Sequence, residues 1–192
     1  PLDPSLIRED VAHSWYADET SGKHPSESET KPQPNKPGGY SWLKSPRYAG
    51  QVYEVGPLAR MLVNYAWGNP MVVQAVDGLL AALGAPTDAL ISTLGRHAAR
   101  ALECKLVADA MAEWVLQLDP DAPAYLPYKL PQEATGMGLT EAPRGAVGHW
   151  IRIKDGVIAN YQAVVPTTWN CSPRDDQDQP GPVEQAIIGT RI

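Results

Sequence analysis

The segment Glu141–Asp175 decides the fold of this chain and reads EAPRGAVGHWIRIKDGVIANYQAVVPTTWNCSPRD. It contains two runs rich in β-branched and aromatic residues, His149–Ile153 and Val157–Val165. Lys154-Asp155-Gly156 separates them, and an Asp-Gly pair between two such runs is a strong hairpin signal. The segment therefore predicts a small antiparallel β-ribbon.

Helical patterns dominate the chain before this segment. We predict a helix from Glu54 to Gly68, another over Met71–Leu83 and a long one over Pro86–Leu118. At 1.5 Å per residue the long helix would reach about 50 Å. Its apolar stripe lacks the charge pairs of a coiled coil, which is typical of a large helix bundle. The stripe comprises Leu90, Leu94, Ala98, Ala101, Leu102, Ala108, Met111, Val115 and Leu118.

The remaining segments complete the prediction of fold class. Residues 17–40 are rich in Ser, Glu, Lys, Pro and Gly, and we expect a solvated surface loop there. Pro, Gly and Thr are expected to break the chain between Asp119 and Thr140, and again from Pro166 to Gly181. A short helix is predicted over Pro182–Ile188. The class is thus α+β, mostly α, with a long-helix bundle core and one antiparallel ribbon.

Composition excludes some classes of function. The 192 residues include 43% hydrophobic ones, mean hydropathy is −0.30, and the formal net charge is −6. Because no basic stripe is visible, nucleic acid is not an expected partner. No apolar run is long enough to span a bilayer, and the first residues lack the pattern of a signal peptide.

Metal-ligand spacing is absent from the sequence. Cys104 and Cys171 lie far apart and form neither a zinc nor an iron–sulfur spacing, so we interpret them as free thiols, buried as small hydrophobes. No two of the four histidines have the i, i+4 spacing of a helical metal site. No glycine-rich phosphate loop or nucleophile elbow occurs.

Polar residues gather at the ends of the predicted ribbon. Arg144 lies in a Pro-Arg-Gly turn before it, Thr167 follows Pro166 directly after it, and Arg174 and Asp175 lie in a later turn. Loops held by a rigid scaffold often carry function. The alternative, that these side chains satisfy only nearby backbone groups of proline-containing turns, stays open on pattern alone.

Six ordered blocks give a more specific indication. They are PLDPSLIREDVAHSWY (1–16), YSWLKSPRY (40–48), EVGPLARMLV (54–63), GRHAARALE (95–103), the quoted segment (141–175) and GPVEQAIIGT (181–190). Together they resemble the large subunit of nickel–iron hydrogenases, in particular the membrane-associated uptake group. The resemblance runs over nearly the whole chain.

The resemblance implies an enzyme that oxidises H2 heterolytically and passes electrons to an iron–sulfur small subunit. A membrane cytochrome b-type acceptor would follow, at the periplasmic face of the cytoplasmic membrane. A nickel–iron centre with carbon monoxide and cyanide ligands would be held by four thiolates from an N-terminal and a C-terminal CxxC. Neither CxxC occurs in this sequence. We therefore interpret residues 1–192 as a partial large-subunit domain that lacks both segments and is inactive alone.

The resemblance also assigns roles to particular residues. Arg144 matches an arginine over the open face of the metal pair, and Pro143 matches the proline beside it. Thr167 matches a hydroxyl that hydrogen-bonds a cyanide, and Val165 and Pro166 match the dry wall around the diatomic ligands.

Three further residues receive other roles from the same resemblance. Ala163 matches a position whose backbone carbonyl binds a remote magnesium-like ion in some members. Arg174 and Asp175 are expected to be structural residues near the site.

Two other hypotheses remain at this point. A nickel-free relative, such as the quinone-site subunit of respiratory complex I, would show Lys in the APxG turn, where this chain has Arg144. A free-standing interaction module would need natural termini, and neither end has the features of one. We rank this third hypothesis last.

Overall fold

The computed structural model describes residues 2–191, which form two compact units. Unit 1 combines two distant stretches, Pro1–Val55 and Leu130–Ile192, and unit 2 consists of Gly56–Lys129. Helix accounts for 36% of the chain and strand for 22%. The predicted α+β class, with helix in excess, is confirmed.

Unit 1 contains the predicted hairpin. Strands β4 (Gly145–Lys154) and β5 (Val157–Val164) pair antiparallel, with a turn at Asp155 and Gly156. Both turn residues have positive φ, 54° and 73°, as a hairpin turn of type I′ requires. The Asp-Gly pair therefore acts as predicted.

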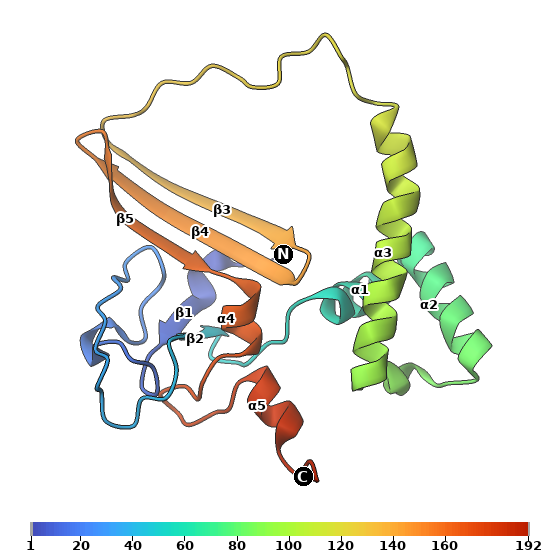
Figure 1. Cartoon of the computed structure of the whole chain (residues 1–192), viewed down its shortest axis with the longest axis horizontal. Helices are drawn as coiled ribbons and strands as arrows, with labels where there is room; N and C mark the ends of the chain where they lie inside the picture. The colour runs from blue at the N-terminus through green and yellow to red at the C-terminus, as the bar shows by residue number, and fades with distance from the viewer. Residues whose placement is uncertain (1, 192) are drawn as a thin grey trace. The chain divides into compact units, whose positions relative to one another are not determined.

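The ribbon has one strand more than predicted. Strand β3 (Ala134–Ala142) pairs antiparallel with β4, so the sheet order is β3-β4-β5 (Figure 1). The prediction of an irregular chain up to Thr140 was wrong here. Gly136 and Gly138 lower the strand propensity of this segment. Pairing with β4 stabilises the strand in spite of that low propensity.

A second sheet of unit 1 was not predicted. Strands β1 (Ile7–Asp10) and β2 (Ser45–Tyr48) pair antiparallel across the intervening loop. The loop is irregular as expected, apart from the 3-10 turn η2 (Asp18–Thr20), but Thr20, Ser28 and Lys36 are buried in it. It is therefore packed into the unit and is more than a solvated connection.

Short helical turns complete unit 1. They are η1 (Pro4–Leu6), α4 (Pro166–Asn170) and α5 (Pro182–Ile187). The expected helix after Gly181 is confirmed, whereas α4 lies in a stretch predicted to be irregular. The hydrophobic core consists of Ile7, Trp150, Val164 and Trp169, with Tyr48 and Val55 packed against it.

Unit 2 is a helical unit. Helix α1 (Pro57–Ala66) packs against α2 (Pro70–Leu83) and α3 (Thr93–Val115), and the 3-10 turn η3 (Thr87–Leu90) packs against α3. Asn69 caps the start of α2 by accepting from the Val72 amide, and Gly84 ends α2 in the left-handed conformation. The core contains Leu58, Met61, Val72, Val76, Leu80, Leu90 and Ala99.

The long helix differs from its prediction in two respects. The helical stretch breaks after Leu90, and α3 begins only at Thr93, because Ser92 accepts a hydrogen bond from the Gly95 amide as its N-cap. Gly95 lies so close to the Leu90 carbonyl that a side chain would not fit there.

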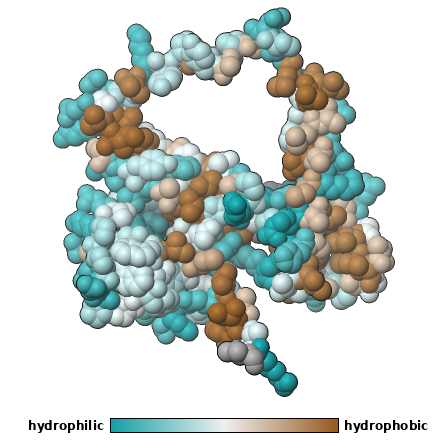
Figure 2. All heavy atoms as spheres, viewed as in Figure 1, coloured by the Kyte–Doolittle hydropathy of each residue, from teal (hydrophilic) through white to brown (hydrophobic). Residues whose placement is uncertain are grey.

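The predicted apolar stripe of α3 is also mostly on the wrong face. Gly95 and Ala99 are the buried residues of α3, while Leu94 and Met111 are 81% and 58% exposed. Figure 2 shows hydrophobic residues at the surface over α2 and α3. Within unit 2, α1 and α2 contact α3 along a face on which buried Gly95 and Ala99 lie beside partly buried Leu102 and Leu106, so only Leu102 of the predicted α3 stripe packs against this core.

Gly148 lies in close contact with the unit 1 core and allows a direct test. A Cβ at this position would lie 2.4 Å from the Trp150 ring. We expect Gly148→Ala to lower the free energy of unfolding by about 1–3 kcal/mol, because the ring must move out of a packed core. Urea unfolding followed by tryptophan fluorescence measures the change.

The matched control is Gly138→Ala on neighbouring strand β3, where a Cβ would meet nothing within 4 Å. It should change the free energy of unfolding by less than about 0.5 kcal/mol. Equal effects of the two substitutions would contradict the assignment of Gly148 to the core contact.

Candidate functional site

The predicted site residues leave the sheet of unit 1 at one end. Gly148 on β4 pairs with Val164, the last residue of β5. Because the strands are antiparallel, the chain preceding Gly148 and the chain following Val164 emerge at the same end of the sheet. The turn that carries Arg144 and the segment that carries Thr167 therefore belong to one end of unit 1 (Figure 1).

Arg144 occupies the tip of a tight turn. Ala142 pairs with Gly145, which leaves Pro143 and Arg144 as a two-residue connection between β3 and β4. Gly145 has φ of 136°, a conformation that favours glycine. Arg144 is exposed, and its guanidinium makes no hydrogen bond or ion pair with any residue that the structure describes. The Arg144 guanidinium is therefore an exposed, permanently charged group of hydrogen-bond donors at the tip of the turn.

The segment after β5 turns directly into α4. Val165 is the N-cap residue, and buried Pro166 takes the first helical position, where its missing N–H costs nothing. Thr168 and Trp169 are buried, which leaves Thr167 on the exposed side of the turn. The Thr167 hydroxyl bonds no side chain or backbone group among residues 2–191 and is free to donate.

Asn170 holds the end of this short helix. Its side-chain amide accepts from the Val55 amide at 2.9 Å and donates to the Val55 carbonyl at 2.8 Å. This reciprocal pair imitates a backbone pairing, so a five-residue helix that would be unstable alone is fixed to the unit. Because Thr167 belongs to the same short helix as Asn170, these hydrogen bonds also fix the position of Thr167.

Ala163 lies on β5, an edge strand of its sheet. Edge strands leave alternate carbonyls without a ladder partner, so a carbonyl ligand is available on this strand. Its register partner His149 accepts from or donates to the Tyr161 hydroxyl through Nδ1 at 2.5 Å. This His–Tyr pair on the outer face was not anticipated from the sequence.

Asp175 is anchored in the interior, as the structural role predicted for it requires. Arg47 donates from Nε to the Asp175 carboxylate at 2.7 Å, and neither side chain has exposed surface. Arg47 also donates to the Gln179 carbonyl and the Ser172 hydroxyl. Sequence reasoning missed Arg47, because an arginine inside a strand-like SPRY block gives no local signal of its partner.

The pKa of Asp175 reflects this anchoring. Burial opposes ionisation of the carboxyl, but hydrogen bonds from the Gln179 amide and the Arg47 guanidinium outweigh it and hold the pKa below its usual value. The neighbouring Arg174 is more exposed and donates to the Asp178 carbonyl at 2.7 Å. Both residues therefore serve the shape of the turn.

The described residues do not by themselves fit a nickel–iron centre. Such a centre needs soft thiolate ligands. Cys104 in unit 2 and Cys171 in unit 1 are free, and both are exposed, contrary to the expectation that they are buried. Residues 2–191 contain no group of three or more His, Cys, Asp or Glu side chains arranged to hold a metal ion. What they offer is donors and apolar surface that could surround such a group.

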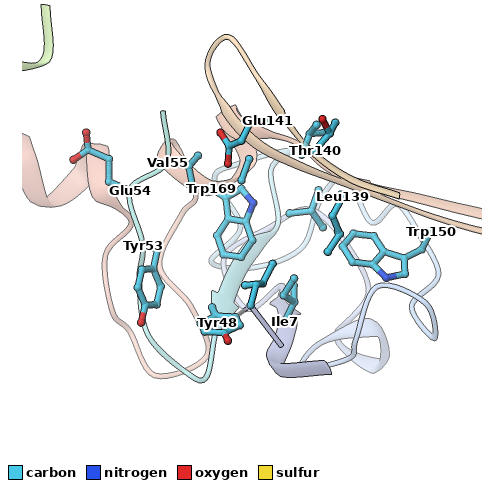
Figure 3. A pocket seen from close by; sticks show the side chains of 15 residues that line it. Ile7, Tyr48, Tyr53, Glu54, Val55, Leu139, Thr140, Glu141, Trp150 and Trp169 are labelled. Atoms are coloured by element: carbon cyan, nitrogen blue, oxygen red, sulfur yellow. The ribbon is translucent and has the colours of Figure 1, made fainter. Parts of the chain in front are cut away.

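An apolar pocket of about 450 Å³ lies beneath the inner face of the sheet. Figure 3 shows Trp169, Leu139 and Ile7 directed toward its centre. None of the predicted site residues lines it, but Glu141, Ala146, Val164 and Trp169 do, so the pocket reaches the same end of the sheet. Alternation along β4 and β5 could have indicated its walls, but not the contribution of β1.

Known proteins similar to this chain identify its family. A family model described as nickel-dependent hydrogenase matches residues 1–192. The chain belongs to the nickel-dependent hydrogenase family. The uptake hydrogenase large subunit of Azotobacter chroococcum mcd 1 is 43% identical over 98% of this chain and 37% of its own length. That of Bradyrhizobium diazoefficiens is 45% identical over 97% of this chain and 36% of its own.

Solved structures agree with the family assignment. The Ni-Fe-Se hydrogenase of Desulfovibrio vulgaris Hildenborough in the reduced state aligns with a TM-score of 0.86 and 40% identity. The alignment covers 97% of this chain and 40% of that one. A reduced, active Ni-Fe-Se hydrogenase from Desulfomicrobium baculatum aligns with a TM-score of 0.85. The chain spans less than half the length of the relatives that it matches.

The buried ion pair yields a prediction about stability and pH. Because the folded pKa of Asp175 lies below its unfolded value, the stabilisation is present above that unfolded value, near 3.8, and is lost as pH falls through the folded pKa. We expect Asp175→Asn to lower the free energy of unfolding at pH 7 by about 3–5 kcal/mol, since Arg47 is left buried without a counter-charge.

Urea unfolding at a series of pH values measures both effects. The difference between wild type and Asp175→Asn should shrink as pH falls below 3.8, because the Asp175 carboxyl of the unfolded chain then binds a proton before that of the folded chain does. Asp178→Asn, at a 70% exposed side chain in the same turn, is the control and should cost less than about 1 kcal/mol. A pH-independent difference between wild type and Asp175→Asn would contradict the role of the charge.

Proposed function

We propose that this chain is part of the catalytic large subunit of an uptake nickel–iron hydrogenase. The enzyme would oxidise H2 heterolytically to protons and electrons. The observation that carries the proposal is an exposed Arg144 guanidinium without a partner among the described residues, at the same sheet end as the free Thr167 hydroxyl. Membership of the nickel-dependent hydrogenase family supports it.

The metal ligands would come from other parts of the large subunit. We propose that residues 1–192 form a partial large-subunit domain, and that thiolates of an N-terminal and a C-terminal CxxC outside it hold nickel and iron. The coverage of the relatives supports this, because this chain accounts for 36–38% of their length. When bound, the centre with its carbon monoxide and cyanide ligands supplies the site of H2 cleavage.

The residues of this chain would surround that centre. Arg144 donates hydrogen bonds and places a fixed positive charge where charge develops during cleavage, which a guanidinium can do without changing protonation. Pro143 restricts the turn that carries it. Thr167 would donate a hydrogen bond from its hydroxyl to a cyanide of the bound centre. Val165 and Pro166 exclude water from the diatomic ligands.

A cation site and partner subunits belong to the same proposal. The Ala163 carbonyl would bind a remote magnesium-like ion. An iron–sulfur small subunit would receive the electrons and pass them to a membrane cytochrome b-type acceptor at the periplasmic face. A relative in Desulfomicrobium baculatum is named periplasmic, and one in Wolinella succinogenes quinone-reactive. No helix among residues 2–191 is long and apolar enough to cross a bilayer.

The nickel-free alternative has less support. A quinone-reducing subunit of the complex I type would share the fold without the nickel chemistry. The relatives reported above are named uptake hydrogenase large subunits, and Arg144 replaces the Lys expected in the APxG turn of such a subunit. Both observations favour the hydrogenase.

Arg144→Lys in the full-length enzyme tests the proposed role. Lysine keeps the charge but loses the planar fork, so we expect hydrogen-dependent dye reduction to fall by about 100-fold. Arg152→Lys, at an exposed arginine on strand β4 away from the Arg144 turn, is the control and should leave turnover unchanged. Unchanged turnover in Arg144→Lys with intact metal content would remove Arg144 from the catalytic role.

Thr167→Val tests the contact with cyanide. Valine keeps the shape but removes the donor, so we expect one cyanide stretching band to shift in the infrared spectrum of the complete enzyme. Thr167→Ser keeps the hydroxyl and should preserve the wild-type spectrum. Identical spectra for all three proteins would exclude this hydrogen bond.

A further inference from the structure

Lys44 is a buried ammonium group with three acceptors in unit 1. Its side chain is 8% exposed, and Nζ lies 3.2 Å from Glu9 Oε2, Ser28 Oγ and Gln162 Oε1. An ammonium has three protons to donate, so these partners account for all of them. The three acceptors come from β1, the loop between β1 and β2, and β5.

Gln162 carries the contact into the sheet. Its Oε1 also accepts from the Thr30 hydroxyl, and its Nε2 donates to the Asn160 side chain at 3.1 Å. Asn160 in turn donates to the Ser28 carbonyl at 2.9 Å. The inner face of β5 is therefore held by directional polar contacts at two alternate residues, just before the strand enters the hydrophobic core at Val164.

Fixing a strand with buried charged side chains costs desolvation free energy. Glu9 is 3% exposed, and burial raises the pKa of its carboxyl, with the Lys44 ammonium opposing the rise. Apolar side chains of similar volume commonly stabilise a core as well as a buried ion pair does. What the ion pair adds is direction, since hydrogen bonds fix the position of Gln162 more tightly than apolar packing does.

We propose that Lys44, paired with Glu9, is a positioning residue that sets the end of β5, and with it Val165–Thr167, for contacts with the bound metal cofactor. This inference rests on the proposed function. Only two residues, Ala163 and Val164, separate Gln162 from Val165. Both lie in β5 and Val164 belongs to the core, so a displacement of Gln162 is transmitted to the α4 turn. Lys44 itself does not touch the cofactor.

The test uses the complete complex of large and small subunits. The double variant Lys44→Met/Glu9→Gln removes the link to Gln162 without leaving an unpaired buried charge. Gln162→Leu removes the acceptor on β5 and keeps the Glu9–Lys44 pair, which provides a second route if the double variant does not assemble. Hydrogen exchange of the backbone amides within 162–168, where Pro166 has none, and the infrared cyanide bands are the measurements.

Lys36→Met is the matched control. Lys36 is equally buried in unit 1, but it donates to the Val11 and Tyr16 carbonyls and pairs with Asp18, with no contact to β5. We expect exchange at 162–168 to rise roughly tenfold in the Lys44 variant, the factor for losing one buried charge-assisted hydrogen bond. It should stay unchanged in Lys36→Met, and the cyanide bands should shift or broaden only when β5 is released.

Each other outcome counts against the inference. Unchanged exchange at 162–168, or an equal rise in Lys36→Met, overturns the positioning of β5 by Lys44. Faster exchange with unchanged cyanide bands overturns its relevance to the cofactor. Failure of the proposed function would look different, because the wild-type complex itself would then show neither cyanide bands nor hydrogen-dependent dye reduction.

Discussion

The Arg47–Asp175 ion pair joins parts of unit 1 that lie 128 residues apart in the chain, and neither side chain has any exposed surface. Arg47 projects from β2, whereas Asp175 lies in the turn that follows α4. A buried charge of this kind is tolerated only with its partner in place, so the two halves of unit 1 must meet before either becomes stable. The position of the exposed end of β5 therefore depends on the association of these two stretches of unit 1.

The order of the chain explains why such contacts are needed. Residues 56–129 form unit 2 and separate the two stretches that make up unit 1. Closing a connection of this length costs conformational entropy, and specific long-range contacts have to offset it. Unit 1 has several of them, among them the ion pair, the reciprocal Asn170–Val55 hydrogen bonds and the Lys44–Gln162 contact.

In the candidate site, some side chains are buried within unit 1 and others are exposed with free hydrogen-bond donors. Pro166, Thr168 and Trp169 are buried, which fixes the α4 turn, while Thr167 and Arg144 remain exposed with their donors free among the described residues. A rigid frame with unpaired donors at one end suits the binding of a group supplied from outside the frame. The described residues do not assemble the thiolates that the family's metal centre needs. The role that we propose for them is therefore to orient and polarise a centre held by other parts of the subunit.

The sequence by itself determined the elements whose signals are local. The Asp155-Gly156 turn and the helices α1 and α2 follow from turn chemistry, capping and periodicity. Ordered sequence blocks indicated the family and singled out Arg144 and Thr167. Tertiary structure decided the rest: β3 exists because β4 pairs with it, α3 buries its small residues because α1 and α2 cover that face, and Arg47 and Lys44 find partners only in the folded chain. The physical reason is that pairing energy and buried charge depend on residues distant in sequence, which no local pattern specifies.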